Sequence, residues 1–270
     1  MLDLIRSTAS YIRTQVEKTP EIGIILGTGL GDLANQIEIV KELDYKDIPN
    51  FPVSTVEGHS GKLIFGNLNG KYVMAMKGRF HYYEGYDMKQ VTFPVRVMKE
   101  LGVKTLIVSN AAGGMNKEFE VGDVMIITDH INLFPENPLR GKNYEELGPR
   151  FPAMTEAYSH RLIRMADEIG KEEKIRLMHG VYVGTPGPTF ETPAEYEYFR
   201  IIGGDAVGMS TVPEVIVANH AGMEVFGVSV ITDLGGKDVT QVPTHEEVQQ
   251  AAVKAQPTVI KLVSTIVGKL

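Results

Sequence analysis

Short apolar runs alternate along the chain with segments whose apolar residues recur about every third or fourth position, the period of a helix with one buried face. A short run of consecutive apolar residues instead indicates a buried strand. The runs that predict strands are Ile22–Leu26, residues 105–109, residues 123–128, Leu177–Gly184 and residues 224–232. We therefore expect strands and helices to alternate, as in a sheet covered by helices.

Helical periods and end signals predict the elements between these strands. Residues 1–16 have a helical spacing of apolar positions, and further helices are expected at residues 91–101, 158–169, 193–202, Val212–His220 and 244–270. An Asn-Gly pair between Lys62–Leu68 and Lys71–Lys77 predicts a hairpin. We predict a single domain over residues 1–270, an α/β fold with three αβα layers and a central mixed β-sheet.

Unusual residues follow five of the predicted strands. They lie at positions 27–31, 78–85, 110–114, 185–191 and 232–233. Ligands of open α/β sheets bind beyond the carboxyl ends of the strands. We therefore expect one binding site where these five segments meet.

The segment Gly27-Thr28-Gly29-Leu30-Gly31 joins a buried strand to residues 32–37, which we expect to begin a helix. Converging backbone N–H groups and the Thr28 hydroxyl favour a phosphate at such a helix N-terminus. The loop matches neither a dinucleotide loop, which needs a small residue where Asp32 stands, nor a P-loop, which needs a following lysine. A plain tight turn is the alternative interpretation.

Residues 78–86 place arginine, histidine, tyrosine and glutamate between glycines. Arg79 offers a planar fork to a phosphate, and His81 offers a donor that Glu84 is placed to orient. A solvated surface loop is the alternative. A second histidine between glycines, His59, is by itself more typical of an ordinary loop.

Phe190 and Glu191 place a ring beside a carboxylate in a proline-rich loop, which suits recognition of a heterocycle. The alternative is an ordinary helix start ahead of Pro193, where acids are also favoured. Ser210 is expected to cap the following helix, to donate to an anion, or to do both.

The composition narrows the classes of function. The 270 residues are 43% hydrophobic and 23% charged, with net charge −7 and no cysteine, which fits a protein with a substantial core and excludes a disulfide framework. No dense Lys/Arg run, membrane-length apolar run or signal peptide is present, so we expect no nucleic-acid or membrane partner and a cytoplasmic location. We expect no metal, because His220 and Glu224 are separated by Gly222 and His245-Glu246-Glu247 lacks a second histidine.

Four long motifs make the chain resemble the trimeric purine nucleoside phosphorylases over nearly its whole length. They are residues 78–86, 109–114, 150–154 (Arg-Phe-Pro-Ala-Met) and 208–214. The resemblance implies reversible phosphorolysis of purine (2′-deoxy)ribonucleosides such as inosine and guanosine, giving the free base and α-D-(deoxy)ribose 1-phosphate in purine salvage. It implies inorganic phosphate as co-substrate, no cofactor, and a homotrimer.

The resemblance also assigns roles to single residues. It implies that phosphate is bound by Thr28, His59, Arg79, His81, the Ala111 backbone N–H and Ser210, ribose by Tyr83, Met209 and His245, and purine by Phe190, Glu191, Val207 and Asp233. Phe151 resembles an aromatic residue that reaches into the site of a neighbouring subunit. The expected catalytic residues are His81, Glu191 and Asp233.

The implied chemistry suits these residue types. Phosphate held beneath the sugar stabilises an oxocarbenium-like ribose and then attacks it, while donors near the purine stabilise the charge on the departing base. No covalent enzyme intermediate is needed.

Asp233 departs from the pattern of phosphorylases specific for 6-oxopurines, which resemble this chain but usually carry asparagine there. An ionised aspartate only accepts hydrogen bonds, which matches a 6-amino group, as in the related methylthioadenosine phosphorylases. Glu191 instead matches the 6-oxopurine enzymes, and a protonated Asp233 is able to donate. We expect relaxed base use, with a methylthioadenosine- or adenosine-preferring phosphorylase as the alternative.

Three other classes remain as alternatives. A nucleosidase of the same fold uses water and has no need of the Arg79, His81 and Ser210 group. A Rossmann oxidoreductase needs a dinucleotide loop, which residues 27–31 do not match. A non-catalytic binding module does not need phosphate-binding and purine-binding residues together.

Overall fold

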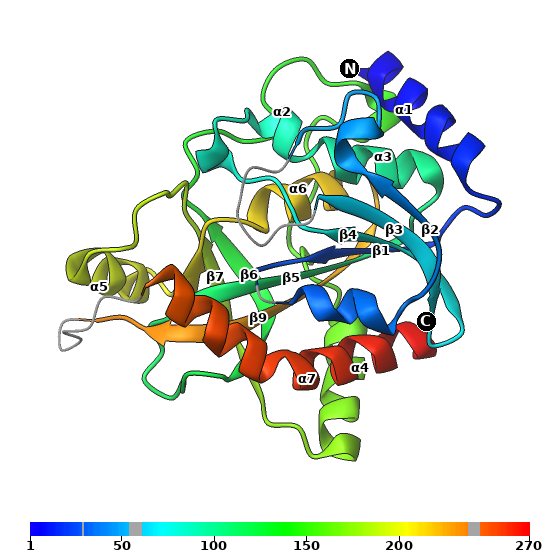
Figure 1. Ribbon diagram of the computed structural model, residues 1–270. Coiled ribbons are helices and arrows are strands. Elements are labelled where there is room, and N and C mark those ends of the chain that lie inside the picture. Colours follow the sequence, from blue (N-terminus) through cyan, green and yellow to red (C-terminus); the bar gives the residue numbers. More distant parts are fainter. Residues whose placement is uncertain (29, 54–60, 237–243) are drawn as a thin grey trace.

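The computed structural model of the protein (Figure 1) describes residues 1–28, 30–53, 61–236 and 244–270. In this part of the chain one mixed sheet has the strand order β2-β3-β4-β1-β5-β8-β7-β6-β9. The strands are β1 (Ile22–Leu26), β2 (Glu38–Asp44), β3 (Lys62–Leu68), β4 (Lys71–Lys77), β5 (Thr105–Gly114), β6 (Val124–Asn132), β7 (Leu177–Gly184), β8 (Ala206–Gly208) and β9 (Glu224–Leu234).

Helices cover both faces of this sheet, as Figure 1 shows. The α-helices are α1 (Leu2–Gln15), α2 (Met88–Val91), α3 (Phe93–Leu101), α4 (His160–Glu173), α5 (Pro193–Ile201), α6 (Val212–His220) and α7 (His245–Lys269). One face packs against α1, α3 and α6, and the other against α4 and α7, so that two large apolar cores lie on opposite sides of the sheet. The predicted α/β class with a central mixed sheet is confirmed.

The sheet closes on itself at one end. β5 pairs with β8 on one side and with β9 on the other, and β8, β7, β6 and β9 are joined in turn. Five strands therefore form a ring, which the alternation of strands and helices in the sequence does not predict. The ring matters for the site because β8 is antiparallel to β5, whereas β4, β1, β5 and β9 all run parallel to one another.

The central strand β1 is buried along its whole length, as its apolar sequence predicts. It lies between β4 and β5 and is parallel to both. Beyond its end, a Cβ on Gly27 would lie 2.5 Å from the Ser109 carbonyl oxygen and 2.7 Å from the Asn110 Cα. The first glycine of the loop is thus needed for the close approach of two backbones.

Several predicted elements have the expected bounds, namely β1, β3, β4, β7 and α6. The helix expected at residues 32–37 is instead a 3-10 helix, Gly31–Gln36, followed at once by β2. This short helix ends because the chain turns into an edge strand that pairs with β3. The chain behind residues 27–31 is therefore only a short 3-10 helix, and the phosphate site expected there stays a prediction.

The segment 110–114 also differs from the expected loop. Strand β5 continues through it to Gly114, because β9 pairs with β5 along its whole length and β8 pairs with its last two residues. The expected helix at residues 91–101 is divided at Thr92, with Pro94 in the first turn of α3, where a missing N–H costs no helical hydrogen bond.

Candidate active site

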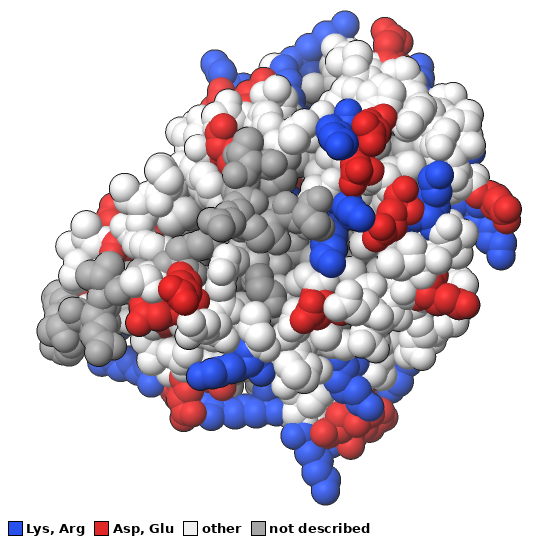
Figure 2. All heavy atoms as spheres, in the orientation of Figure 1, with Lys and Arg blue, Asp and Glu red and all other residues white. Residues whose placement is uncertain are grey.

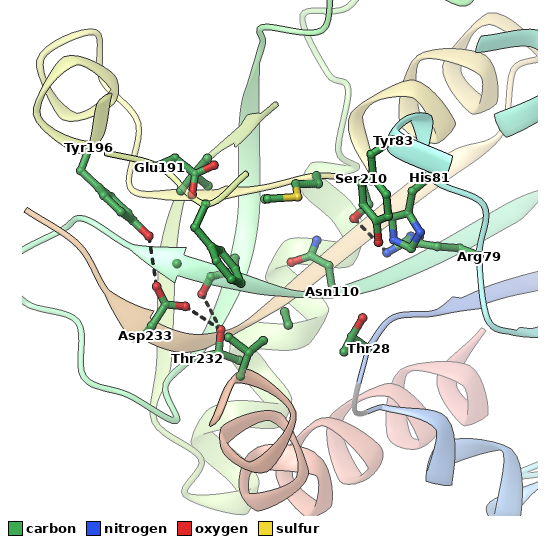
Figure 3. A pocket seen from close by; sticks show the side chains of 18 residues that line it. Thr28, Arg79, His81, Tyr83, Asn110, Glu191, Tyr196, Ser210, Thr232 and Asp233 are labelled. Carbon is green, nitrogen blue, oxygen red and sulfur yellow. Dashed lines mark hydrogen bonds between the residues drawn. The ribbon is translucent and has the colours of Figure 1, made fainter. Parts of the chain in front are cut away.

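A pocket opens where the ends of the central strands meet the ring (Figure 3). Eighteen residues line it: Thr28, Arg79, His81, Tyr83, Asn110, Ala111, Ala112, Gly113, Phe190, Glu191, Tyr196, Val207, Gly208, Met209, Ser210, Thr232, Asp233 and Val248. They come from the ends of β1, β4 and β9, from the last part of β5, from β8 and the segment after it, from the loop that enters α5, and from α5 and α7 themselves. All five segments singled out in the sequence contribute to this one pocket.

Eleven of the residues expected at the site line this pocket: Thr28, Arg79, His81, Tyr83, Ala111, Phe190, Glu191, Val207, Met209, Ser210 and Asp233. His59 and the side chain of His245 lie outside the described part of the chain. Phe151 is not among the residues that line the pocket of its own chain: it is 87% exposed, and the Arg150 guanidinium lies 5.5 Å from its ring centroid.

Arg79 is held at the polar end of the pocket by a buried carboxylate. Its Nε and Nη2 donate to the two carboxylate oxygens of Glu214, at 3.1 and 2.9 Å, and both side chains are almost fully buried. Its Nη1 donates to the Ser109 carbonyl oxygen at 2.7 Å and to the Ser210 hydroxyl at 3.2 Å. Nε and Nη2 therefore face Glu214, whereas Nη1 faces Ser210 and the pocket (Figure 3).

Ser210 reaches this arginine because of the ring closure. β8 pairs antiparallel with β5, Val207 opposite Gly113 and Ala206 opposite Gly114, so the chain beyond Gly208 runs back along β5 toward Arg79. The Ser210 hydroxyl also lies 3.1 Å from the Thr211 hydroxyl. The expectation that Ser210 caps α6 is wrong, because Thr211 occupies the N-cap position with positive φ and makes no side-chain cap hydrogen bond.

His81 is oriented by Glu84, as the sequence led us to expect. The Glu84 carboxylate accepts from the His81 backbone N–H at 2.8 Å and from the ring Nδ1 at 3.0 Å, so Nδ1 carries a proton. The imidazole also stacks on Tyr83, with ring centroids 4.7 Å apart. Burial raises the pKa of Tyr83 to about 12, so its hydroxyl stays neutral and able to donate.

Two partly buried carboxyl groups mark the opposite end of the pocket. Burial raises the pKa of both Glu191 and Asp233 above their ordinary values. Glu191 accepts from the Thr185 hydroxyl at 3.3 Å. Asp233 accepts from the Thr232 hydroxyl at 3.0 Å and from the Tyr196 hydroxyl at 3.0 Å. The pocket thus has cationic and hydroxyl donors at one end and carboxyl acceptors at the other.

No metal site accompanies these groups in the described residues, where no three His, Cys, Asp or Glu side chains gather closely enough to bind an ion. Nor does any helix within the described ranges have the length and apolarity needed to cross a membrane. On the face in Figure 2 the described basic and acidic side chains are interspersed, which is not the basic patch that a nucleic-acid interface needs.

Comparison with known proteins shows which family this chain belongs to. A family model described as the phosphorylase superfamily matches residues 21–268. The chain belongs to this superfamily. Among its relatives, purine nucleoside phosphorylase 1 of Bacillus subtilis (strain 168) is 54% identical over 269 residues, which covers 100% of this chain and 99% of the relative.

Solved structures of superfamily members agree with the fold. A Schistosoma mansoni purine nucleoside phosphorylase in complex with adenosine superposes with a TM-score of 0.95 at 43% identity, covering 100% of this chain and 98% of the other. The same kind of enzyme in complex with inosine gives a TM-score of 0.93 at 42% identity, covering 100% and 97%. The motif resemblance in the sequence is therefore confirmed.

Some residues that line or support the pocket were given no role of their own from the sequence. They are Glu214, Tyr196, Val248, Asn110 and Thr232, of which the last two lie in segments that the sequence singled out. Asn110 donates to the Thr211 hydroxyl at 2.9 Å, while its buried Oδ1 has no hydrogen-bond partner in the described structure. Asn110 and Glu214 lie within recognised motifs, which was the available signal; a tyrosine four residues into a predicted helix gave none.

Proposed function

We propose that the chain is a purine nucleoside phosphorylase, a pentosyltransferase that splits purine nucleosides with inorganic phosphate into free base and α-D-ribose 1-phosphate. The observation that carries this is the pocket itself, with an arginine, a histidine and hydroxyls at one end and two carboxyls with raised pKa at the other. Strong identity with enzymes of that name supports the same reaction. The reaction recovers free bases, the chemistry of purine salvage.

The polar end suits a phosphate co-substrate. The proposed contacts Arg79, Ser210, His81, Thr28 and the Ala111 backbone N–H belong to residues that line the pocket, and the arginine is already oriented by Glu214. Fixed donors of this kind bind an anion without having to reorganise. His59 is a further proposed phosphate ligand that lies outside the described residues.

The proposed catalytic step needs little more than positioning. Phosphate beneath the ribose stabilises positive charge at the anomeric carbon and attacks as the glycosidic bond breaks. Tyr83, Met209 and His245 are the proposed ribose contacts, and no cofactor or covalent enzyme intermediate is required. Phe190, Val207, Glu191 and Asp233 are the proposed purine contacts.

In this proposal, the preference for one purine base over another depends on Asp233. Burial raises the pKa of both carboxyls, which favours the protonated form that donates to a 6-oxo group. Related Schistosoma mansoni enzymes have been crystallised with adenosine and with inosine. We propose relaxed base use here, with inosine, guanosine and adenosine as substrates, and an adenosine-preferring phosphorylase as the second candidate.

The deciding experiment measures base release from inosine with and without phosphate. A phosphorylase releases hypoxanthine only when phosphate is present and forms ribose 1-phosphate in equal amount. Release that is independent of phosphate, with free ribose as the sugar product, would identify a nucleosidase and overturn the proposal. No release with any purine nucleoside would favour a binding module.

We also propose a homotrimer in which Phe151 completes the site of a neighbouring subunit. The support is its 87% exposed ring in a chain segment that makes no contact with its own pocket. A single exposed apolar side chain is common by itself, so the resemblance of residues 150–154 to the motif of the trimeric enzymes is the second support. Analytical ultracentrifugation should then give about three times the chain mass of 29.8 kDa.

Mixed oligomers test whether the sites are shared. Subunits with Phe151→Ala keep Ser210, and subunits with Ser210→Ala keep Phe151, so trimers that contain both should regain sites with both residues intact. We expect mixed trimers to exceed the average activity of the two parents. Activity no higher than that average would argue against a shared site. Ile201→Ala, which removes another exposed apolar side chain (74% exposed), is the control and should behave as wild type.

A further inference from the structure

We infer that Tyr196 is a specificity-determining residue: its hydroxyl holds Asp233 as a hydrogen-bond acceptor toward the base and so favours 6-aminopurines over 6-oxopurines. The inference rests on the proposed function. Tyr196 would act through Asp233, without needing to touch the substrate itself. It is therefore a positioning residue for base selection.

Two hydroxyl groups donate hydrogen bonds to the Asp233 carboxylate (Figure 3). The Tyr196 Oη donates to Asp233 Oδ2 at 3.0 Å, and the Thr232 hydroxyl donates to Oδ1 at 3.0 Å. The Thr232 hydroxyl also lies 3.3 Å from the Ala112 carbonyl oxygen, and its single proton serves only one of these acceptors at a time. Tyr196 is consequently the steadier of the two donors.

The chain is shaped around the Tyr196 ring. A Cβ on Gly235 would lie 2.2 Å from the ring, and a Cβ on Gly113 would lie 2.5 Å from Oη. Glycine therefore stands in β5 and directly after β9, where any larger residue would collide with the phenol. Helix α5, which carries Tyr196, is fixed at its start by reciprocal hydrogen bonds between Thr192 and Glu195.

The titratable groups around Asp233 explain why the phenol stays the donor. Burial and the nearby Asp233 and Glu191 carboxyls raise the pKa of Tyr196 well above its ordinary value, so it keeps its proton. Burial raises the pKa of Asp233, while the hydrogen bonds from Thr232 and Tyr196 lower it. Glu195, on α5 as well, acts on Glu191. From β5 and α7 the pocket is lined here by the uncharged Gly113 and Val248.

Without the phenolic hydroxyl of Tyr196, Asp233 should therefore keep its proton up to a higher pH. An ionised carboxylate accepts from a 6-amino group and repels a 6-oxygen, whereas a protonated carboxyl is able to donate to that oxygen. Loss of one donor to a buried carboxylate favours its neutral form. Tyr196→Phe should thus shift the enzyme toward inosine while it keeps the ring in its place.

The test compares kcat/KM for adenosine and inosine over the whole pH range in which the enzyme is stable, with phosphate saturating. In wild type the adenosine-to-inosine ratio should rise with pH as Asp233 ionises. In Tyr196→Phe this rise should move to higher pH, and at a pH within the rise the ratio should fall about tenfold, the effect of losing one hydrogen bond to a charged group. Tyr198→Phe, on the same helix but 52% exposed, should match wild type.

A second variant keeps the inference falsifiable by itself. Asp233→Asn leaves Tyr196 in place and removes one of the two titrating carboxyls, so adding Tyr196→Phe to Asp233→Asn should not change the pH profile of the ratio any further. A further shift of the profile in that double variant, or a Tyr196→Phe profile identical to wild type, would overturn the inference. Phosphate-independent base release in wild type would instead overturn the proposed function, so the two failures are distinct.

Discussion

Replacing Glu214 by glutamine should destabilise the protein far more than the loss of an ordinary ion pair. Glu214 neutralises Arg79 through two hydrogen bonds of 3.1 and 2.9 Å, and the exposed fractions of the two side chains are 4% and 1%. Glutamine has nearly the same shape but no charge, so the guanidinium would remain buried without a counter-ion. The substitution isolates the charge from the packing.

The expected magnitude follows from this burial. Removing one partner of a buried pair costs about 3–5 kcal/mol, because the remaining charge keeps its full desolvation penalty. In a chain of this size each kcal/mol lowers the unfolding midpoint by roughly 2–4 °C, so Glu214→Gln should melt about 6–20 °C below wild type. Glu42→Gln breaks the Lys62–Glu42 pair, whose side chains are both 37% exposed, and should cost about 1 kcal/mol or less.

Thermal unfolding with and without phosphate is the assay. Phosphate bound at the Arg79 edge supplies negative charge to the folded state alone, so saturating phosphate should recover more stability in Glu214→Gln than in wild type. Glu42→Gln should respond to phosphate as wild type does. A melting temperature of Glu214→Gln within the range of Glu42→Gln would refute the reasoning, because the buried arginine would then not depend on Glu214 for its charge balance.

Three further predictions concern other parts of the chain. Gly27→Ala should destabilise by about 1–3 kcal/mol by forcing β1 and β5 apart, while Gly31→Ala, whose Cβ would meet only the end of a lysine at 3.5 Å, should be nearly neutral in denaturant unfolding. Arg79→Ala should lower kcat/KM for phosphate by about 10- to 100-fold in steady-state assays, and an unchanged value would remove it from the phosphate site. Burial lowers the pKa of His130 in the folded protein. As the pH falls below about 6.5, the unfolded chain therefore binds a proton at His130 before the folded chain does, and the free energy of unfolding should decrease. This decrease should be smaller in His130→Gln.

The proposed choice between purine bases depends on the two carboxyl groups of the pocket. Asp233 and Glu191 both have pKa values raised by burial, and each is fixed by hydroxyl donors. In the proposed function, a carboxyl whose protonation decides between donor and acceptor makes base selection depend on pH. We propose that selection then depends on Tyr196 and Thr232, the residues behind the carboxyl, as much as on the groups that face the base.

The sequence alone determined the elements whose signals are local. Strand β1 is an unbroken apolar run, the hairpin of β3 and β4 has an Asn-Gly turn, and α6 lies between clear end signals, so their bounds were predictable. The motifs also identified eleven residues that the fold brings to one pocket. This succeeds because backbone conformation and burial follow from neighbours along the chain.

Tertiary structure decided what depends on distant partners. The largely exposed β2 becomes a strand because it pairs with β3, and β5 extends to Gly114 because β9 and β8 pair with it. The same ring closure turns Ser210 toward Arg79. Arg79 and Glu214 lie 135 residues apart, and Tyr196 and Asp233 lie 37 apart. The pattern of apolar and polar residues predicts which residues are buried, but not which residues they contact. Those contacts form between segments far apart in the sequence, which meet only when the sheet closes.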